Sequence, residues 1–210
     1  MAARPRLVVA TRSGHKLREL RELLDLDAAL LSLDDLGVEG DVVEDATTFA
    51  GNAAKKARAA VRATGLPALA DDSGIEVDAL GAAPGVRTRR YAGEDATDEE
   101  NNAKLLAALG GLPPERRGAR YVCVLAFAVA DRRGRAGGVV VVTRRGTLRG
   151  RIATAPRGDG GFGYDPIFEP QGEPVGGRTL GQWSAEEKNR ISHRGRAARR
   201  MATLLRTLGF

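Results

Sequence analysis

Two adjacent aspartates, Asp71 and Asp72, follow a short apolar run over residues 66–70. The run predicts a strand over 67–70 that is buried in a sheet, and open α/β sheets bind ligands beyond the carboxyl ends of such strands. Neighbouring carboxylates repel one another, so a metal ion, a proton-accepting role or a helix cap has to favour the pair. Because Asp, Ser and Gly also form turns, segment 70–74 taken alone is equally consistent with a polar turn.

The two aspartates are predicted to have different roles. Side chains alternate between faces along a strand, so Asp71 and Asp72 cannot point the same way unless the chain turns there. We expect one carboxylate to face a cleft and the other to support the loop.

Hydrophobic spacing predicts strands and helices that follow one another along the chain. Strands are expected at 6–11, 29–33, 67–70, 119–130, 138–143 and 147–152, and helices at 17–24, 49–64, 101–109 and after residues 184 and 192. Candidate N-caps are Thr47 or Thr48, Thr97 and Ser184. The strands at 119–130 and 138–143, with a turn at 131–134 between them, are expected to form an antiparallel pair, and the strand at 147–152 extends a predicted sheet that is mixed rather than purely parallel.

The polar loop after the first strand is suited to an anion. Residues 12–16 place backbone N–H groups at a helix N-terminus, and Lys16 lies where its ammonium can meet a phosphate. The loop is not a Walker A motif, because the Gly-x4-Gly-Lys pattern is absent. A solvated helix start is the alternative interpretation. Glu44 lies just before the helix at 49–64, where its carboxylate can either interact favourably with the dipole of that helix or bind a metal ion.

A second segment with unusual chemistry is the glycine-aromatic loop, residues 158–168. Its glycines allow the backbone to approach a ligand closely, and Phe162 or Tyr164 offers a ring on which a planar base can stack. The alternative is a flexible hairpin tip.

Composition limits the possible partners. The 210 residues carry a net charge of +6, which favours anionic ligands and makes nucleic acid an alternative partner. An arginine-, alanine- and glycine-rich composition produces the same excess of positive charge without any function. The single cysteine, Cys123, lies in an apolar run and is expected to be a buried, unreactive thiol.

The histidines and the apolar stretches of the sequence limit which metals and membranes the protein can bind. His15 and His193 lack a zinc-binding spacing, so the sequence suggests only a hard, oxygen-ligated cation. No apolar stretch approaches the ~18 residues that span a bilayer, so we expect a cytoplasmic protein with no membrane partner.

Four motifs occur in a familiar order. They are the acidic segment 70–74, Ala83-Pro-Gly85 with Arg90-Tyr-Ala-Gly93, the segment Gly-Phe-Gly-Tyr-Asp-Pro at 161–166, and Ser192-His-Arg-Gly195. In these motifs the chain resembles the inosine triphosphate pyrophosphatase family, over about 7–205. The resemblance implies an α/β fold with an elongated mixed β-sheet flanked by helices, two lobes around a central nucleotide-binding cleft, a single domain over 1–210, and a homodimer.

The resemblance also implies a role for each matched residue. Asp72 would be the catalytic base and a Mg²⁺ ligand, and Glu44 would assist as a second metal ligand. The residues expected to hold the triphosphate are Thr11, Arg12, Ser13, Gly14, His15 and Lys16. Those expected to bind the rest of the substrate are Ser73, Phe162, Gly163, Tyr164, Asp165 and Lys188, with His193 and Arg194 helping to read the base.

Two positions depart from the family pattern. The family usually has Thr-x-Asn in its first loop, where this chain has Ser13 in place of the asparagine. The family's Glu-Asn-Ala in the second helix begins here with Gly51, which removes a candidate acid near the metal. These departures bear on affinity and metal geometry more than on identity.

Together the residues and the resemblance predict a Mg²⁺-dependent nucleoside triphosphate diphosphatase. It would convert XTP, ITP and dITP to the monophosphate and pyrophosphate, clearing deaminated purines from the nucleotide pool, with no stable nucleic-acid partner. One alternative is a pyrophosphatase for modified pyrimidine triphosphates on a similar fold. The other is a basic nucleic-acid-binding module, which leaves the acidic loops unexplained.

Overall fold

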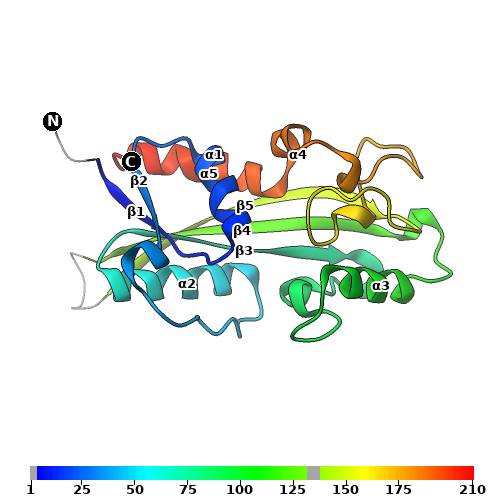
Figure 1. The fold of residues 1–210 in the computed structure, drawn as a ribbon, viewed down its shortest axis with the longest axis horizontal. Coiled ribbons are helices and arrows are strands. Elements are labelled where there is room, and N and C mark those ends of the chain that lie inside the picture. The colour runs from blue at the N-terminus through cyan, green and yellow to red at the C-terminus, as the bar shows by residue number, and fades with distance from the viewer. Residues whose placement is uncertain (1–3, 132–137) are drawn as a thin grey trace. The chain divides into compact units, whose positions relative to one another are not determined.

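The strands of the protein form a mixed sheet. The computed structural model describes residues 4–131 and 138–210, so all but the first residue of the turn predicted at 131–134 lies outside the described residues. Within these ranges the strand order across the sheet is β2-β1-β3-β4-β5-β6 (Figure 1), and the strands are β1 (Arg6–Val9), β2 (Ala29–Ser32), β3 (Ala68–Val77), β4 (Gly118–Ala130), β5 (Val139–Ile152) and β6 (Phe168–Pro170). β1 pairs in parallel with β2 and β3, whereas β5 and β6 are antiparallel. The mixed sheet flanked by helices that the sequence predicts is confirmed.

Three helices begin where the sequence places caps. The helices are α1 (Gly14–Leu24), α2 (Phe49–Thr64), α3 (Asp98–Ala108), α4 (Ala185–Ile191) and α5 (His193–Thr207), with 3-10 turns η1 (Asp34–Leu36), η2 (Asp78–Leu80), η3 (Gly85–Arg90), η4 (Pro114–Arg116), η5 (Asp165–Ile167) and η6 (Leu180–Gln182). The side chains of Thr48, Thr97 and Ser184 cap α2, α3 and α4, whereas α1 begins three residues before the expected 17. Across the described ranges, no helix has the length and apolar character that a membrane crossing requires.

The chain divides into two compact units. Unit 1 comprises residues 1–72, 123–146 and 194–210, and unit 2 comprises 73–122 and 147–193. The division falls between Asp72 and Ser73, inside β3. The single domain over 1–210 that the resemblance implies stays a prediction.

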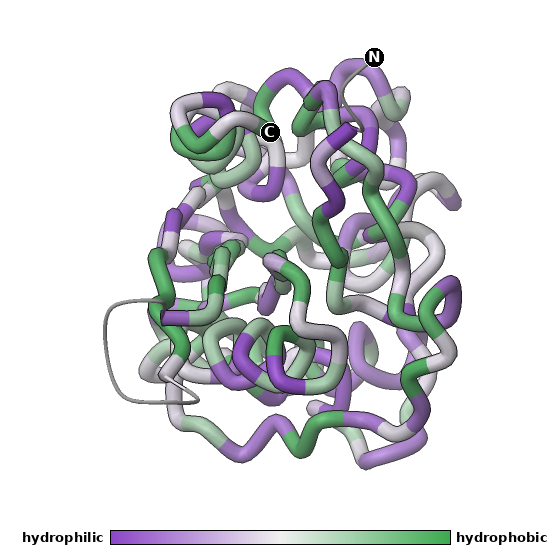
Figure 2. Tube along the Cα trace, turned by 90° about the vertical axis from the view of Figure 1, so that its left-hand side faces the viewer, coloured by the Kyte–Doolittle hydropathy of each residue, from purple (hydrophilic) through white to green (hydrophobic). Residues whose placement is uncertain are grey.

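Unit 1 has helices on both faces of its strands. α1 and α5 lie on one face and α2 on the other (Figure 1). Hydrophilic and hydrophobic residues follow one another at short intervals along the chain (Figure 2). The layer between the strands and the helices α1 and α5 contains the fully buried side chains Leu7, Leu20, Leu24, Leu69, Leu125, Met201 and Leu205. Burial of each contributes roughly 2–3 kcal/mol. Cys123 is buried in the same cluster, as predicted.

Unit 2 has its own core. Leu105 and Leu109, within and just after α3, pack with Ile152 at the end of β5 and with Ile167 and Phe168. The ring of Tyr121 on β4 lies 4.7 Å from that of Phe168, centroid to centroid, and joins the same cluster. This core supports the glycine-aromatic loop, whose Tyr164 is also buried in it.

The strand that carries the acidic pair is longer than expected. The prediction that it ends at Ala70 is wrong, because β3 continues through both aspartates to Val77. The chain stays extended because Ile75 and Val77 are fully buried in unit 2 and Oγ1 of Thr88 accepts a hydrogen bond from the Ile75 N–H at 2.9 Å. The polar turn that Asp, Ser and Gly also allowed is therefore excluded.

β5 is also longer than either of the strands predicted for its region. The two strands expected at 138–143 and 147–152 form one strand, β5. Gly146 lies inside it in extended conformation, because a glycine weakens a strand without terminating it.

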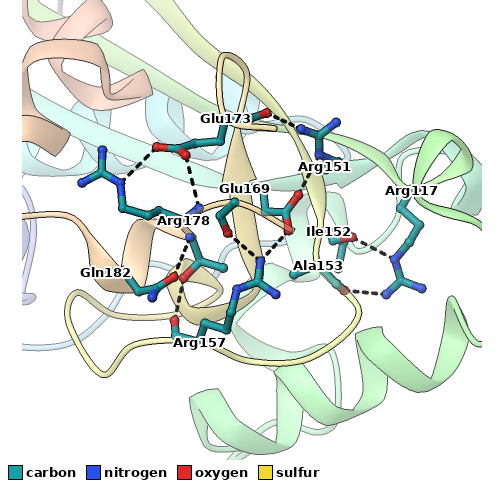
Figure 3. Close-up of polar contacts among 11 residues, drawn as sticks. Arg117, Arg151, Ile152, Ala153, Arg157, Glu169, Glu173, Arg178 and Gln182 are labelled. Atoms are coloured by element: carbon teal, nitrogen blue, oxygen red, sulfur yellow. Dashed lines mark hydrogen bonds and ion pairs between the residues drawn. The ribbon is translucent and has the colours of Figure 1, made fainter. Parts of the chain in front are cut away.

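Buried and half-buried arginines and glutamates connect the segments of unit 2 (Figure 3). Arg117 is 4% exposed and donates hydrogen bonds to three backbone carbonyl oxygens: those of Leu109 at 2.8 Å, Ile152 at 2.8 Å and Ala153 at 2.7 Å. Glu169 on β6, also buried, accepts hydrogen bonds from Arg151 and Arg157. None of these four charged residues was singled out from the sequence.

We expect Arg117→Met to lower the free energy of unfolding by about 3 kcal/mol, since methionine preserves the aliphatic volume but leaves three buried carbonyls without their donor. Urea unfolding followed by circular dichroism measures the change. Arg116→Met, at the exposed neighbouring position, is the matched control and should unfold like the wild type. Equal stabilities for the two variants would contradict this role of Arg117.

Candidate active site

The acidic pair lies beyond the end of the neighbouring strand. β1 and β3 are parallel with Val9 opposite Leu69, and the Ala10 N–H donates to the Leu69 carbonyl at 2.7 Å. β1 ends at Val9 while β3 continues. Asp71 and Asp72 therefore lie past the carboxyl end of β1, in the position where parallel strands present ligand-binding residues.

Asp71 points toward α1 and α5. Its Oδ2 lies 3.1 Å from Nζ of Lys16 and 3.6 Å from Nη2 of Arg194, and the residue is 1% exposed. Burial alone would raise the pKa of Asp71, but Lys16 and Arg194, with Lys56, hold it well below its ordinary range. Arg194 also pairs with Glu19 of α1. Asp71 is thus a charged carboxylate fixed between two cations.

Asp72 points to the opposite face, toward α2. Its Oδ2 accepts a hydrogen bond from Nδ2 of Asn52 at 3.1 Å, and its Oδ1 lies 3.9 Å from Nζ of Lys56. The same ammonium lies 3.1 Å from Oε1 of Glu44. Burial raises the pKa of Asp72 to about 6, an effect that Lys56 opposes and Glu44 reinforces. A carboxylate with this pKa can accept a proton near neutral pH.

The chemistry of Glu44 and Asp72 fits a magnesium ion. Both carboxylates reach one ammonium, that of Lys56, so their oxygens are presented to one small region. Mg²⁺ prefers oxygen ligands, keeps several waters and needs only one or two protein carboxylates together with substrate phosphates. The described residues contain no group of three or more His, Cys, Asp or Glu arranged to hold a metal. Glu44 and Asp72 together could therefore serve a shared site but not an all-protein cage.

The β1–α1 loop, residues 10–13, is ordered by its own hydroxyls. The Ser13 N–H donates to Oγ1 of Thr11 at 3.2 Å, and Oγ of Ser13 caps α1 by accepting from the Lys16 N–H at 3.4 Å. Ser13, the departure from the family's asparagine, is thus the N-cap of α1. Gly14 and His15 are the first two residues of α1, and the His15 side chain lies outside the described part of the structure.

In unit 2, Asp165 organises the glycine-aromatic loop. Its Oδ2 lies 2.6 Å from Nζ of Lys188 and accepts from the Phe162 N–H at 3.0 Å, while its Oδ1 accepts from the Tyr121 hydroxyl at 3.2 Å. A Cβ at Gly161 would lie 2.2 Å from Asp165, so only glycine fits there. Burial, with Asp165 beside it, raises the pKa of Tyr121 well above its ordinary value, which keeps its hydroxyl protonated as a donor.

Further hydrogen bonds hold the glycine-aromatic loop in place. Oδ2 of Asp98 accepts from the Gly163 N–H at 2.6 Å, and Nδ2 of Asn102 donates to the Gly163 carbonyl at 3.0 Å. The Tyr164 hydroxyl donates to the Thr88 carbonyl at 2.8 Å. The loop is therefore not a free hairpin tip.

The exposed ring belongs to Phe162, which is 44% exposed. The Lys188 ammonium lies 5.5 Å from the centre of this ring. Phe162 therefore offers an accessible aromatic face with a positive charge beside it.

The other residues expected to bind substrate are placed differently. Ser73 is the first residue of unit 2 and lies in β3. The His193 ring stacks on Tyr121 in unit 2, with centroids 4.7 Å apart and planes 7° apart. Arg194 is 1% exposed in unit 1, where it pairs with Asp71 and Glu19. The adjacent His193 and Arg194 thus contribute to different units, and their role in reading a base stays a prediction.

Sequence reasoning missed Asn52 and Lys56. They are four residues apart on α2, a spacing that puts both on one helix face, and this spacing was the available signal. The other departure, Gly51, faces the segment that carries Glu44. A Cβ at Gly51 would lie 2.7 Å from Cβ of Ala46, so the glycine allows that segment to approach α2 closely.

Comparison with known proteins places the chain in a family. A sequence model described as the Ham1 family matches residues 7–204. A protein named dITP/XTP pyrophosphatase from Anaeromyxobacter sp. is 47% identical, covering 96% of this chain and 97% of its own. One of the same name from Frankia alni is 50% identical, covering 96% and 97%.

Two solved structures are similar to this chain in both fold and sequence. A HAM1 protein from Coxiella burnetii has a TM-score of 0.84 and 41% identity, covering 97% of this chain and 99% of its own. A structure described as nucleoside-triphosphatase / dITP/XTP pyrophosphatase from Mycobacterium abscessus has a TM-score of 0.74 and 44% identity, covering 95% and 98%.

The raised pKa of Asp72 has a consequence for stability. Its folded-state pKa, about 6, lies above its ordinary value of 3.8, so folding favours the protonated form and the charged form opposes folding above pH 6. In buffer with EDTA, Asp72→Asn should therefore raise the free energy of unfolding at pH 8 by about 3 kcal/mol. That gain should shrink as the pH falls through 6 and vanish near pH 4.

Asp71→Asn is the matched control, one residue away. Its lowered pKa means that the charged form stabilises the fold, so this variant should be less stable than the wild type at pH 7 and approach it only in strong acid. Urea unfolding across the pH series measures both. Shifts of the same sign in the two variants would contradict the opposite environments of the two carboxylates.

Proposed function

Because the chain belongs to the Ham1 family, we propose that it hydrolyses non-standard purine nucleoside triphosphates. The substrates are dITP, XTP and ITP, and the products are the nucleoside monophosphate and pyrophosphate. Such a reaction clears deaminated purines from the nucleotide pool. Relatives that carry the name dITP/XTP pyrophosphatase at 47–50% identity support this substrate class.

The observation that carries the proposal is the environment of Asp72. A buried carboxylate with a pKa of about 6 lies beside Glu44 and Lys56, past the end of a parallel strand. In the proposed reaction Asp72 orients a water molecule and accepts its proton. The ammonium groups of Lys16 and Lys56 balance negative charge on the triphosphate.

Asp72 and Glu44 are the residues that would hold Mg²⁺. When bound, the ion supplies positive charge to the phosphate oxygens and the departing pyrophosphate. The backbone N–H groups at the start of α1, with Lys16, are proposed to bind the phosphates, because a helix N-terminus favours anions. Asp71 keeps Lys16 in place through their 3.1 Å contact.

Residues of unit 2 are proposed to bind the nucleoside. The exposed Phe162 ring can stack on a base, and Lys188 beside it offers a donor. Selectivity for a 6-keto purine follows if donors face O6, because an adenine amino group would leave them unpaired. Ser73, His193 and the backbone of Gly163 complete the proposed set.

Three further properties belong to the proposal. Activity requires Mg²⁺, the protein is a homodimer, and it acts in the cytoplasm. The oxygen donor set of Glu44 and Asp72 supports the first property, and the resemblance to a family whose members are commonly dimers supports the second.

Substrate choice tests the proposal directly. Pyrophosphate release should be roughly 100-fold more efficient in kcat/KM for dITP and XTP than for dATP, and should stop in EDTA. A panel that includes modified uridine and thymidine triphosphates separates the alternatives. Preference for those pyrimidines would favour the pyrimidine pyrophosphatase, and salt-sensitive DNA or RNA binding without turnover would favour the nucleic-acid-binding module.

Asp72→Asn should lower kcat for dITP by about 100-fold or more, because the amide cannot accept the proton from water. Steady-state pyrophosphate release measures the loss. Asp27→Asn, at an exposed position of unit 1, serves as the control and should keep wild-type turnover. Retention of wild-type kcat by Asp72→Asn would remove Asp72 from the role of base.

A further inference from the structure

The resemblance implies that Arg12 holds the triphosphate, but its guanidinium donates hydrogen bonds to residues 34–41. Its Nε donates to Oδ1 of Asp41 at 2.7 Å, and its Nη1 donates to Oδ1 of Asp34 at 2.5 Å. Its Nη2 donates to the carbonyl oxygens of Gly40 at 2.7 Å and Val38 at 3.0 Å. One side chain thus gathers four acceptors from residues 34–41.

The bound residues lead into the segment that carries Glu44. Residues 38–46 form neither helix nor strand. Their far end is held by α2, through Lys56 to Glu44 at 3.1 Å and Lys55 to Asp45 at 2.6 Å. Their near end is held by Arg12. Glu44 therefore lies between two anchors, and Arg12 supplies one of them.

We propose that Arg12 is a positioning residue rather than a ligand of the triphosphate, and that its side chain fixes the 38–46 segment and thereby the carboxylate of Glu44. The proposal rests on the proposed function, in which Glu44 is a metal ligand. An extended chain covers about 3.4 Å per residue, so an anchor at Asp41 keeps Glu44 within about 10 Å of it. Because Arg12 lies between Thr11 and Ser13, it also connects the β1–α1 loop to the 38–46 segment, which carries Glu44.

The geometry requires arginine rather than any cation. Asp34 and Asp41 have side chains 69% and 84% exposed, so a single ion pair with either contributes little. A planar fork of five N–H donors can bind two carboxylates and two carbonyls at once, which an ammonium on a flexible stem cannot. Arg12→Lys should therefore fail to replace Arg12.

The first test measures the mobility of the 38–46 segment in the protein without metal or nucleotide. Val43 is 70% exposed, next to Glu44, so Val43→Cys can carry a nitroxide spin label. Cys123 is fully buried, and burial raises its thiol pKa to about 12, so the label is confined to position 43. In this background, Arg12→Ala and Arg12→Lys should increase label mobility about twofold, and Asp41→Asn should increase it less.

Arg4→Ala is the matched control for these spectra. Arg4 pairs with Asp27 elsewhere in unit 1, at 2.9 Å and with both side chains more than 70% exposed. Its loss should leave the label unchanged. An unchanged spectrum in Arg12→Ala, or an equal change in Arg4→Ala, overturns the proposal.

The second test separates positioning from a general loss of structure. In Arg12→Ala the Mg²⁺ concentration for half-maximal dITP hydrolysis should rise roughly tenfold, while kcat at saturating Mg²⁺ changes less than about threefold. A fall in kcat with an unchanged Mg²⁺ requirement overturns the proposal.

The two proposals fail in distinguishable ways. Label mobility that depends on Arg12 in a protein without dITP turnover supports the anchor and contradicts the proposed function. Turnover of dITP together with label mobility that does not depend on Arg12 supports the proposed function and contradicts the anchor.

Discussion

The alternation of side chains along β3 is the constraint on which the proposed catalytic chemistry depends. Asp71 and Asp72 are neighbours in sequence but lie on opposite faces, so their charges are balanced by different helices. Asp71 meets Lys16 and Arg194 on the face of α1 and α5. Asp72 meets Asn52 and Lys56 on the face of α2. An extended strand thus separates two carboxylates that a turn would have left to repel one another.

This separation gives adjacent aspartates opposite proton affinities. Two cations lower the pKa of Asp71, whereas burial raises that of Asp72 to about 6. Titratable neighbours whose environments push their pKa values apart are typical of acid–base sites. Asp71 is therefore suited to hold Lys16 in place, and Asp72 to accept a proton, although the two residues are chemically identical.

Local patterns predicted the elements of the fold better than their limits. Caps at Thr48, Thr97 and Ser184 depend on neighbouring residues and were found from sequence. The end of β3 was not, because the strand is kept extended by the burial of Ile75 and Val77 in the core of unit 2 and by the Thr88 hydroxyl, which the local pattern at 70–74 does not reveal. The pair of Asn52 and Lys56 was within reach through its i, i+4 spacing, since Glu44 was already a candidate.

Arginines show why composition was a weak guide to partners. The net charge of +6 made a nucleic acid an alternative partner, yet several arginines serve internal contacts. Arg117 binds three carbonyls, Arg194 two carboxylates, and Arg12 four acceptors along one segment. The fork of donors that suits arginine to phosphate suits it equally to carbonyls and carboxylates of its own chain. A count of basic residues therefore overstates the charge that an anionic ligand would meet.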